Sequence, residues 1–383
     1  MIIIKLLKFK YSFKKNKKVE ILLLDDNYAN LKFKNRTVSV VNFQELNFYY
    51  FFKSIFYYFF KNNEKLKIKR LYWKLLIRDF DPIVAIGHEL NMRIFEFKDL
   101  FPYKKTIAYQ FSQYWDIHIE RSRDQLTGKK CDYFFIFREW EKKIFNVIDT
   151  KFIISGSIKN NEKITVAEEK KYDLMFISEF RKLDPKTINK IKKGYHSYTF
   201  ANRSIDMSFK DVCSIYVLNI INNFRNKKNI QLSVARSSIR KDKKHKLSKE
   251  DEMKFFNEYL NDFHVEEIDS FQLAEKSDVI ICITSNLGPE LLARGKKVLF
   301  LNLNSLTHDW PFLPTDEGSF WYKGKKPEKI QEKIEYLLSL SSNEWTKVLN
   351  DTNIKMNFDP QNSKLKDLVD KICQKEKTTR NYH

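Results

Sequence analysis

Short apolar runs alternate with longer amphipathic segments along the first half of the chain. Runs bounded by glycine, proline or acidic residues are typical of buried strands, whereas apolar positions three or four residues apart are typical of helices. The pattern predicts helices at 48–60, 70–80 and 138–148. It predicts strands at 19–26, 37–43, 81–87, 104–111, 131–137 and 151–157. This alternation indicates an α/β domain with a parallel sheet.

A second alternation follows the polar segment 158–171, which we interpret as a linker. A charged loop is predicted at 240–252. The predicted strands are 172–178, 230–236, 277–284 and 297–302, and the predicted helices are 212–224, 252–262 and 326–340. We therefore predict two domains and a polar tail, at 1–158, 172–360 and 361–383. Both domains are expected to be Rossmann-like parallel-sheet units that face each other across a cleft, with ligands at the carboxyl ends of the strands.

Size and composition agree with two soluble domains. The 383 residues exceed what one hydrophobic core usually covers, and the composition is 43% hydrophobic and 31% charged. The formal net charge of +21 predicts attraction to nucleic acid, anionic lipid or phosphorylated small molecules, unless the lysines only solvate the surface. The four cysteines show no zinc or disulfide pattern, which favours a reducing, cytoplasmic setting.

The N-terminal region combines lysines with aromatic residues. Residues 1–18 contain seven lysines and no acid, and they lack the apolar segment of a signal peptide. These lysines predict weak, peripheral attachment to an anionic membrane surface. Residues 48–60 contain ten aromatic residues in thirteen positions. This aromatic run fits either a membrane-surface helix or a helix packed in the domain core, and we favour the core helix.

The segment 277–302 carries the most chemical information. Its first strand ends at Thr284, Ser285 and Asn286, where the ligand crevice of a parallel sheet is expected. A short helix is predicted to follow, and the second strand begins after it. The N-terminus of such a helix favours phosphate, because its amide groups lack helical partners.

Glycine, proline and one acid define this short helix. Gly288 fits a helix cap and Pro289 the first helical position, while Gly295 fits the position just after the helix. Glu290 is in the first turn. It either accepts hydrogen bonds from the paired hydroxyls of a ribose or only complements the helix dipole.

The order of several motifs resembles a known family. The motifs are "ILLLDDNYANLKF", "DPIVAIGHELN", "TIAYQF", "CDYFFIF", "ISGSIKNN", "DLMFISEF", "SDVIICITSNLGPELLARGKKVLFLN" and "HDWPFLPTDEGSFWYKG". Together they extend over most of the chain and resemble bacterial surface-carbohydrate or capsule polysaccharide biosynthesis proteins of the GT-B glycosyltransferase superfamily. That family is similar in fold to glycerophosphotransferases of teichoic acid synthesis and to sugar-nucleotide 2-epimerases.

The resemblance implies that the C-terminal half binds a nucleotide-sugar donor. Glu290 would hold the ribose hydroxyls, and Gly288 would allow close approach of the phosphates. Arg236 is either a phosphate clamp or an exposed arginine of a basic loop. The donor-binding candidates are Ser178, Arg181, Arg236, Thr284, Ser285, Asn286, Gly288 and Glu290. His308 and Asp309 are candidate sugar contacts, although we favour a loop ordered by Trp310 and Trp321.

The resemblance further implies that the N-terminal half presents the acceptor and a general base. His88 and Glu89 follow the strand 81–87, and either could be this base or have a structural role. At 88–91 and 109–113, only Asn91 and Gln110 match the pattern that the resemblance leads us to expect.

We therefore predict a metal-independent GT-B glycosyltransferase without a cofactor, acting in the cytoplasm or peripherally at the inner face of the cell membrane. The expected partners are a nucleotide-sugar donor, a glycan or lipid-linked acceptor and an anionic membrane surface. One alternative is a sugar-nucleotide 2-epimerase, which would need several carboxylates and a histidine around one sugar. Another is a basic, non-enzymatic binder of nucleic acid or an anionic surface. Because the sequence lacks the known nucleic-acid-binding motifs, no nucleic acid partner is expected.

Overall fold

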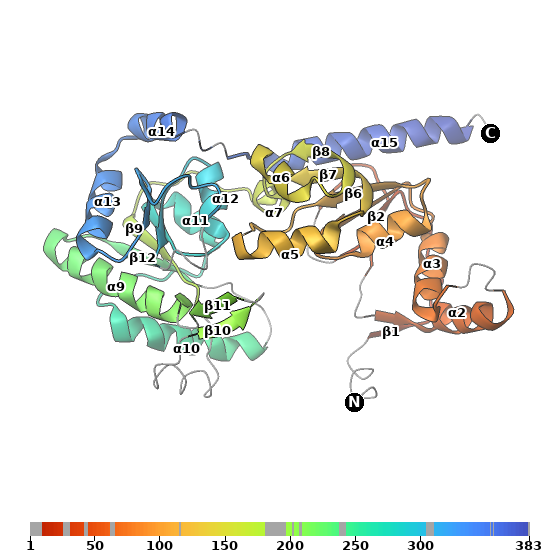
Figure 1. Cartoon of the computed structure of the whole chain (residues 1–383), viewed down its shortest axis with the longest axis horizontal. Coiled ribbons are helices and arrows are strands. Elements are labelled where there is room, and N and C mark those ends of the chain that lie inside the picture. Colours follow the sequence, from red (N-terminus) through yellow and green to blue (C-terminus); the bar gives the residue numbers. More distant parts are fainter. Residues whose placement is uncertain are drawn as a thin grey trace. The chain divides into compact units, whose positions relative to one another are not determined.

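The structure, a computed structural model, describes residues 10–25, 31–41, 45–61, 66–114, 116–180, 197–200, 203–206, 209–236, 243–303, 310–352, 354 and 356–381. The chain forms two compact units, whose elements are labelled in Figure 1. Unit 1 comprises Met1–Phe111, Leu126–Glu162 and Asp359–His383, and unit 2 comprises Ser112–Gln125 and Lys163–Phe358. Each unit contains a six-stranded, mostly parallel sheet. The prediction of two Rossmann-like parallel-sheet units is confirmed.

The sheet of unit 1 is parallel throughout and has the strand order β3-β2-β5-β6-β7-β8. Its strands are β2 (Ile21–Leu23), β3 (Val38–Val40), β5 (Val84–His88), β6 (Lys105–Tyr109), β7 (Lys130–Ile136) and β8 (Asp149–Ile154). Each of these strands overlaps one of the six predicted apolar runs, although β5, β7 and β8 extend beyond the runs by one or two residues. The helical elements of this region are α4 (Arg93–Leu100), η1 (Glu139–Glu141), α6 (Lys142–Phe145) and α7 (Ile158–Glu162). The predicted helix 138–148 is therefore a 3₁₀ turn followed by one short helix.

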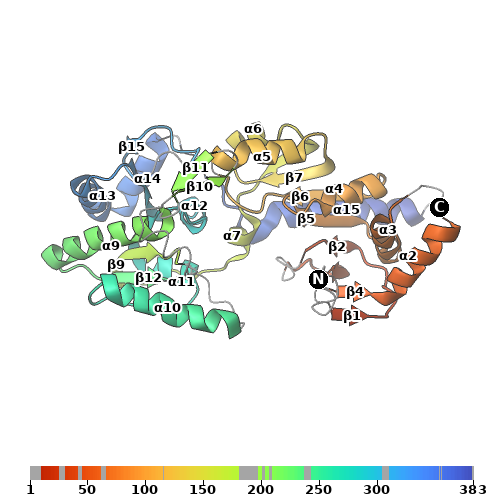
Figure 2. The ribbon, with the colours of Figure 1, turned by 60° about the horizontal axis from the view of Figure 1, so that its bottom comes forward.

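The aromatic run forms helix α2 (Phe48–Phe60), but this helix is not buried in the core. It packs against α3 (Ile68–Phe80) beside the strand pair β1 (Lys10–Ser12) and β4 (Glu45–Asn47), as Figure 2 shows. Tyr50 and Ser54 are the buried residues of α2. The favoured interpretation as a core helix is therefore wrong, because one side of α2 meets unit 1 and the other side stays exposed. None of the described helices is long and apolar enough to cross a membrane.

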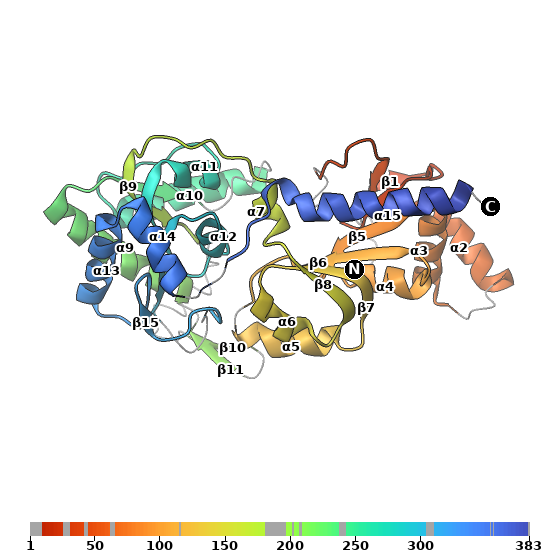
Figure 3. The same ribbon diagram turned by 90° about the horizontal axis from the view of Figure 1, so that it is seen from above.

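The predicted polar tail is also corrected. Residues 360–381 contain η2 (Pro360–Asn362) and the long helix α15 (Ser363–Asn381), which lies along unit 1 in Figure 3. One side of α15 joins the unit 1 core through Leu365, Val369, Ile372 and Cys373. Their spacing is that of a helix with one apolar side, which the many charged residues between them concealed.

The sheet of unit 2 has the order β12-β9-β13-β14-β16-β15, and only β15 is antiparallel to its neighbour. Its strands are β9 (Tyr172–Ile177), β12 (Leu232–Ala235), β13 (Ser277–Cys282), β14 (Lys297–Asn302), β15 (Glu317–Gly318) and β16 (Trp321–Lys323). A separate hairpin comprises β10 (Ser197–Phe200) and β11 (Arg203–Asp206). The four predicted strands of this half are confirmed, whereas β15 and β16 are too short to give a clear apolar run.

The helices of unit 2 include two that the sequence pattern did not predict. They are α9 (Phe209–Lys228), α10 (Lys243–Tyr259), α11 (Ser270–Glu275), α12 (Leu287–Ala293), α13 (Pro327–Ser339) and α14 (Ser342–Asp351). The unpredicted helices of unit 2 are α11 and α14. Helix α5 (Asp116–Leu126), whose last residue is assigned to unit 1, was also not predicted. Residues 243–252 belong to α10, so the predicted charged loop is helical there.

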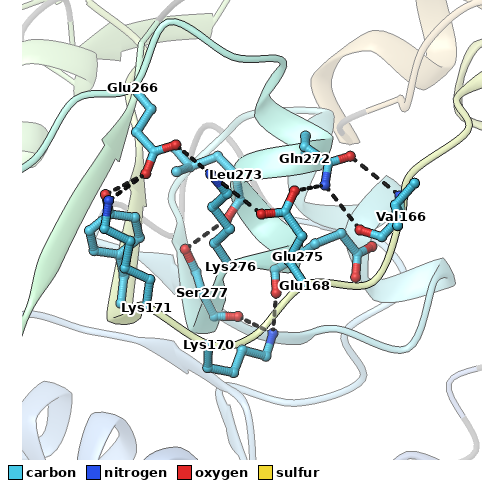
Figure 4. A network of polar contacts seen from close by, with 11 residues as sticks. Val166, Glu168, Lys170, Lys171, Glu266, Gln272, Leu273, Glu275, Lys276 and Ser277 are labelled. Atoms are coloured by element: carbon cyan, nitrogen blue, oxygen red, sulfur yellow. Dashed lines mark hydrogen bonds and ion pairs between the residues drawn. The ribbon is translucent and has the colours of Figure 1, made fainter.

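Polar side chains at the amino ends of β9 and β13 hold the segment 163–171 against the rest of unit 2 (Figure 4). Glu266 accepts hydrogen bonds from Lys276 at 2.7 Å, from the Tyr172 hydroxyl at 2.5 Å and from Lys171 at 3.1 Å. These bonds, above all that from Lys276, lower the pKa of Glu266 to about 2. The network lies at the edge of the sheet opposite the carboxyl ends of its strands, so we assign it a structural role.

Candidate functional site

Each of the two sheets reverses its strand order at one point. In unit 1, β2 lies between β3 and β5, and in unit 2, β9 lies between β12 and β13. Successive crossovers therefore go to opposite sides of β2 and of β9. Open parallel sheets bind ligands at the carboxyl ends of the strands at such a switch point. The candidate sites are therefore the loops after β2 and β5 in unit 1 and those after β9 and β13 in unit 2.

His88 ends β5 at the switch point of unit 1, with its ring centroid 4.8 Å from that of Phe111. The Asn91 backbone N–H is shared between the His88 carbonyl and His88 Nδ1, which accept it at 3.1 Å each. Because a backbone amide can only donate, the neutral ring carries its proton on Nε2. Burial lowers the pKa of His88, against a smaller opposite effect of the Asp25 carboxylate. The neutral form is therefore favoured near pH 7.

This geometry changes the role that His88 can have. A general base needs an unprotonated nitrogen, and Nδ1 already accepts from Asn91. The Nε2–H group can instead donate to an oxygen of a bound molecule. Glu89 is only 1% exposed, and its Oε2 accepts the Phe111 N–H at 2.8 Å. Glu89 therefore fixes the turn after β6, and in this geometry His88 presents an N–H donor, while the role of either residue as the base stays a prediction.

Asp25 belongs to the same switch point, although the sequence analysis did not select it. The Tyr109 hydroxyl donates to its two carboxylate oxygens at 3.1 and 2.9 Å. Asn91 connects the loops after β2 and β5, because its Nδ2 donates to the Leu24 carbonyl at 2.9 Å. The available signal was the pair of acids that ends the apolar run 19–26.

At the switch point of unit 2, Glu179 binds Thr284. The Thr284 backbone N–H donates to Glu179 Oε1 at 3.0 Å, and its hydroxyl donates to Oε2. This pair joins the loop after β9 to the loop after β13. Ser178 donates to the buried Glu252 and accepts the Phe180 N–H at 3.2 Å. Glu179 was missed by the sequence analysis, and its signal was only its position after a predicted strand.

Arg236 follows β12, the neighbour of β9, at the same edge of the sheet. Its side chain is 8% exposed and forms an ion pair with Glu267 through Nη2. Its Nε is buried and has no hydrogen-bond partner among the described residues. Of the two sequence interpretations, the exposed arginine of a basic loop is therefore wrong.

The turn after β13 leads directly into α12. Ser285 accepts the Leu287 N–H at 3.3 Å, and Asn286 is the N-cap residue with an exposed side chain that makes no capping bond. Pro289 is therefore at the third helical position rather than the first, where its missing N–H again has no helical partner. Gly295 has a φ of +80° just after the helix, as predicted.

Gly288 permits a close approach, but the approaching group is a protein side chain. A Cβ atom at Gly288 would lie 2.4 Å from Cys282 Sγ and 2.8 Å from Cys282 Cβ. Cys282 is fully buried in β13, and burial raises the pKa of its thiol. Gly288 thus lets α12 pack against the sheet, and its role beside a phosphate stays a prediction.

Gly288→Ala is expected to lower the free energy of unfolding by about 1–3 kcal/mol, the usual range for overpacking a tight contact. Urea unfolding of both proteins measures this difference. The double variant with Cys282→Ala should regain part of the loss, because it removes the nearer Sγ atom. If Cys282→Ala restores no stability to Gly288→Ala, the contact with β13 does not explain why position 288 is a glycine.

Glu290 lies in the first turn of α12 and is buried. Burial lowers the pKa of Arg294, four residues later, and the negative charges of Glu275 and, less strongly, Glu290 oppose this shift. Arg294 donates to the Lys163 carbonyl at 2.6 Å and to the Thr165 hydroxyl at 3.2 Å. Arg294, the cation near Glu290, thus already has hydrogen-bond partners. Both predicted roles of Glu290, binding ribose hydroxyls and complementing the helix dipole, stay open.

Three predicted residues lie outside the described residues: Arg181, His308 and Asp309. The neighbouring Trp310 is buried and donates from Nε1 to the Ile283 carbonyl at 3.2 Å. Among the described residues, no cluster of His, Cys, Asp and Glu is arranged to hold a metal ion.

Comparison with known proteins identifies the family. The family described as "putative O-antigen biosynthesis protein" matches residues 111–373, which is more than half of the chain. The chain belongs to this family. The resemblance to surface-carbohydrate biosynthesis proteins is therefore confirmed. The matched range of the chain includes every donor-binding candidate but not His88 and Glu89. No curated protein matches the sequence.

Several solved structures are similar to this chain. MurG of Acinetobacter baumannii is 10% identical with a TM-score of 0.45, over 91% of this chain and 90% of that chain. The UDP-N-acetylglucosamine 2-epimerase of Rickettsia bellii is 12% identical with a TM-score of 0.45, over 88% and 94%. A chain of the GtfA/B complex is 12% identical with a TM-score of 0.40, and the match spans 81% of this chain but only 61% of that chain.

Proposed function

We propose that this protein is a glycosyltransferase that moves a sugar, or a sugar-like group, from a nucleotide-activated donor to a cell-surface glycan or lipid-linked acceptor. Membership of an O-antigen biosynthesis family supports a role in building a surface glycan. In this proposal, unit 2 binds the donor and unit 1 contributes to recognition of the acceptor. The donor candidates are Ser178, Arg181, Arg236, Thr284, Ser285, Asn286, Gly288 and Glu290, with His308 and Asp309 as candidate sugar contacts.

The observation that carries the proposal is the buried guanidinium of Arg236 at the ligand-binding edge of the sheet. Its Nε lacks a hydrogen-bond partner among the described residues. A buried donor without a partner costs about 1–3 kcal/mol, and an anionic oxygen would remove this cost with a charge-assisted bond. A donor phosphate at the switch point supplies such an oxygen. Arg236 would also offset the charge of the leaving diphosphate, so we propose that transfer needs no bound metal ion.

His88 is proposed to act on the acceptor. Its Nε2–H would donate to the acceptor oxygen and orient it. For His88 to take a proton instead, the bond from Asn91 to Nδ1 would have to break. Glu89 would support this site through the turn that it fixes after β6.

We also propose that the protein acts in the cytoplasm, at the inner face of the cell membrane, in the synthesis of capsule or another surface polysaccharide. Exposed lysines near the N-terminus support weak electrostatic attachment to anionic lipid: Lys14, Lys15, Lys17 and Lys18. Each cation near an anionic surface contributes about 1 kcal/mol, and the attraction decreases with salt.

A sugar-nucleotide 2-epimerase is the second candidate. It is favoured by the presence of two carboxylates and a histidine at one switch point, namely Asp25, Glu89 and His88. Both carboxylates already accept hydrogen bonds from the protein, which favours the transferase.

One experiment separates these functions. Thermal shift with UDP-, GDP-, CMP- and CDP-linked sugars selects the donor, which is then supplied with a labelled sugar to the full chain and a membrane extract. Transfer of label to the lipid or glycan fraction, unchanged by EDTA, is expected. Label that stays in a nucleotide sugar of changed stereochemistry would indicate an epimerase. Absence of any thermal shift would contradict both functions.

A further inference from the structure

Helix α2 turns its apolar side away from the core of unit 1. Phe52, Phe56, Phe59 and Phe60 are 59%, 51%, 69% and 73% exposed. Their spacing places them on one side of the helix. The buried Tyr50 lies on the opposite side, where its hydroxyl accepts a hydrogen bond from a backbone amide and donates one to Asp79. A surface helix of a soluble domain normally has the reverse distribution.

The exposed rings and the half-buried Phe48 form an aromatic ridge, which we define as Phe13, Phe48, Phe52, Phe56, Phe59 and Phe60. Phe48 stacks on Phe13 and on Phe52, with ring centroids 5.1 and 5.8 Å apart. The Phe56 and Phe60 centroids are 5.0 Å apart. The six residues are all phenylalanines, so the ridge itself has no hydrogen-bonding side chain. An apolar side of this size on one helix indicates that something covers it.

Positive charge lies near the aromatic ridge. Within α2, Lys53 lies 5.1 Å from the Tyr49 ring centroid and forms an ion pair with Asp79 at 3.9 Å. Just after the helix, Lys61 lies 5.7 Å from the Tyr57 ring centroid. Four exposed lysines follow the first ring of the ridge: Lys14, Lys15, Lys17 and Lys18. No acidic residue occurs in α2. Helices that lie in the membrane interface combine these two features, because the rings enter the acyl boundary while lysines meet anionic headgroups.

We propose that α2 is an in-plane membrane anchor that inserts the aromatic ridge into the surface of an anionic bilayer. With 13 residues, α2 is too short to span a bilayer, and its contact with α3 holds the ridge outward. The inference goes beyond the electrostatic attachment proposed above, because apolar insertion persists at high salt whereas attraction between charges does not. It depends on no property of the donor site.

Co-sedimentation of the full chain with vesicles tests the anchor. The vesicles contain phosphatidylcholine alone or mixed with phosphatidylglycerol. Phe52→Ser/Phe56→Ser/Phe59→Ser is expected to lower binding to mixed vesicles at least about tenfold and to remove the part that survives high salt. Tyr103→Ser, at an exposed aromatic residue elsewhere in unit 1, is the matched control and should bind as the wild type does.

Two further measurements test whether the triple variant is folded and whether the aromatic ridge enters the bilayer. The triple variant should retain the wild-type melting temperature and donor thermal shift, because the replaced side chains are exposed. A Phe56→Trp variant should show fluorescence that shifts to the blue with mixed vesicles and is quenched by brominated lipid.

Unchanged salt-resistant binding of the triple variant would overturn the anchor and leave the electrostatic attachment and the transferase proposal intact. The anchor would also be overturned if the wild type is a dimer that does not bind vesicles and the triple variant is a monomer. That result would assign the aromatic ridge to contact with a second copy of the chain.

Discussion

Replacing Glu290 with glutamine should weaken donor-nucleotide binding by about 10- to 150-fold, because hydrogen bonds to a charged acceptor contribute about 1.5–3 kcal/mol. Glutamine keeps the size of the side chain and its place in α12. It loses the charge that would accept from both ribose hydroxyls. Titration calorimetry with the donor chosen by thermal shift measures the change.

A melting curve of the same variant separates the alternative role of Glu290. If this carboxylate only complements the helix dipole and the charge of Arg294, stability should fall by about 0.3–1 kcal/mol while affinity stays the same. Glu275→Gln is the matched control. Glu275 also favours the charged form of Arg294, but it ends α11 and belongs to the structural network at the other edge of the sheet. Equal loss of affinity in both variants would contradict the ribose role.

Replacing His88 with alanine should lower kcat/KM for sugar transfer by about 10- to 150-fold, the effect expected for one hydrogen bond to an oxygen that gains charge. His88→Gln should lose less than about tenfold, because its amide can place an N–H group near the position of Nε2. If His88 were instead a general base, both variants should lose about 100- to 10,000-fold. Transfer assays with the two variants therefore distinguish donation from proton abstraction.

The pH dependence provides a second test of His88. Its lowered pKa means that the unfolded state takes up a proton before the folded state does. The contribution of His88 to stability is therefore complete above about pH 6.5, the ordinary histidine value, and decreases as the pH falls below it. The melting temperature of the wild type should thus fall more steeply with acid than that of His88→Gln. Parallel curves would mean that burial does not keep the His88 ring neutral in solution.

Local sequence determined most of the two sheets. Strands such as β5 and β13 are continuous apolar runs, because a central parallel strand is covered on both faces and needs no polar positions. The ends of such strands mark the ligand edge of the sheet, so Thr284 and His88 were identified from the chain alone. The apolar spacing of α15 was also present, but its many charged residues made the segment look like a tail.

Only the tertiary structure decided which partners these residues have. Glu179 and Thr284 are far apart in sequence, and their bond depends on β9 and β13 being neighbours in the sheet. The role of His88 depends on the direction of one backbone N–H, which no residue pattern encodes.

The exposed side of α2 has the same explanation. Aromatic residues occupy nearly every position of this helix, so its sequence has no polar side to show which face meets solvent. The hydrogen bond from Tyr50 to Asp79 in α3, with the burial of Tyr50 and Ser54, fixes which side of α2 meets unit 1.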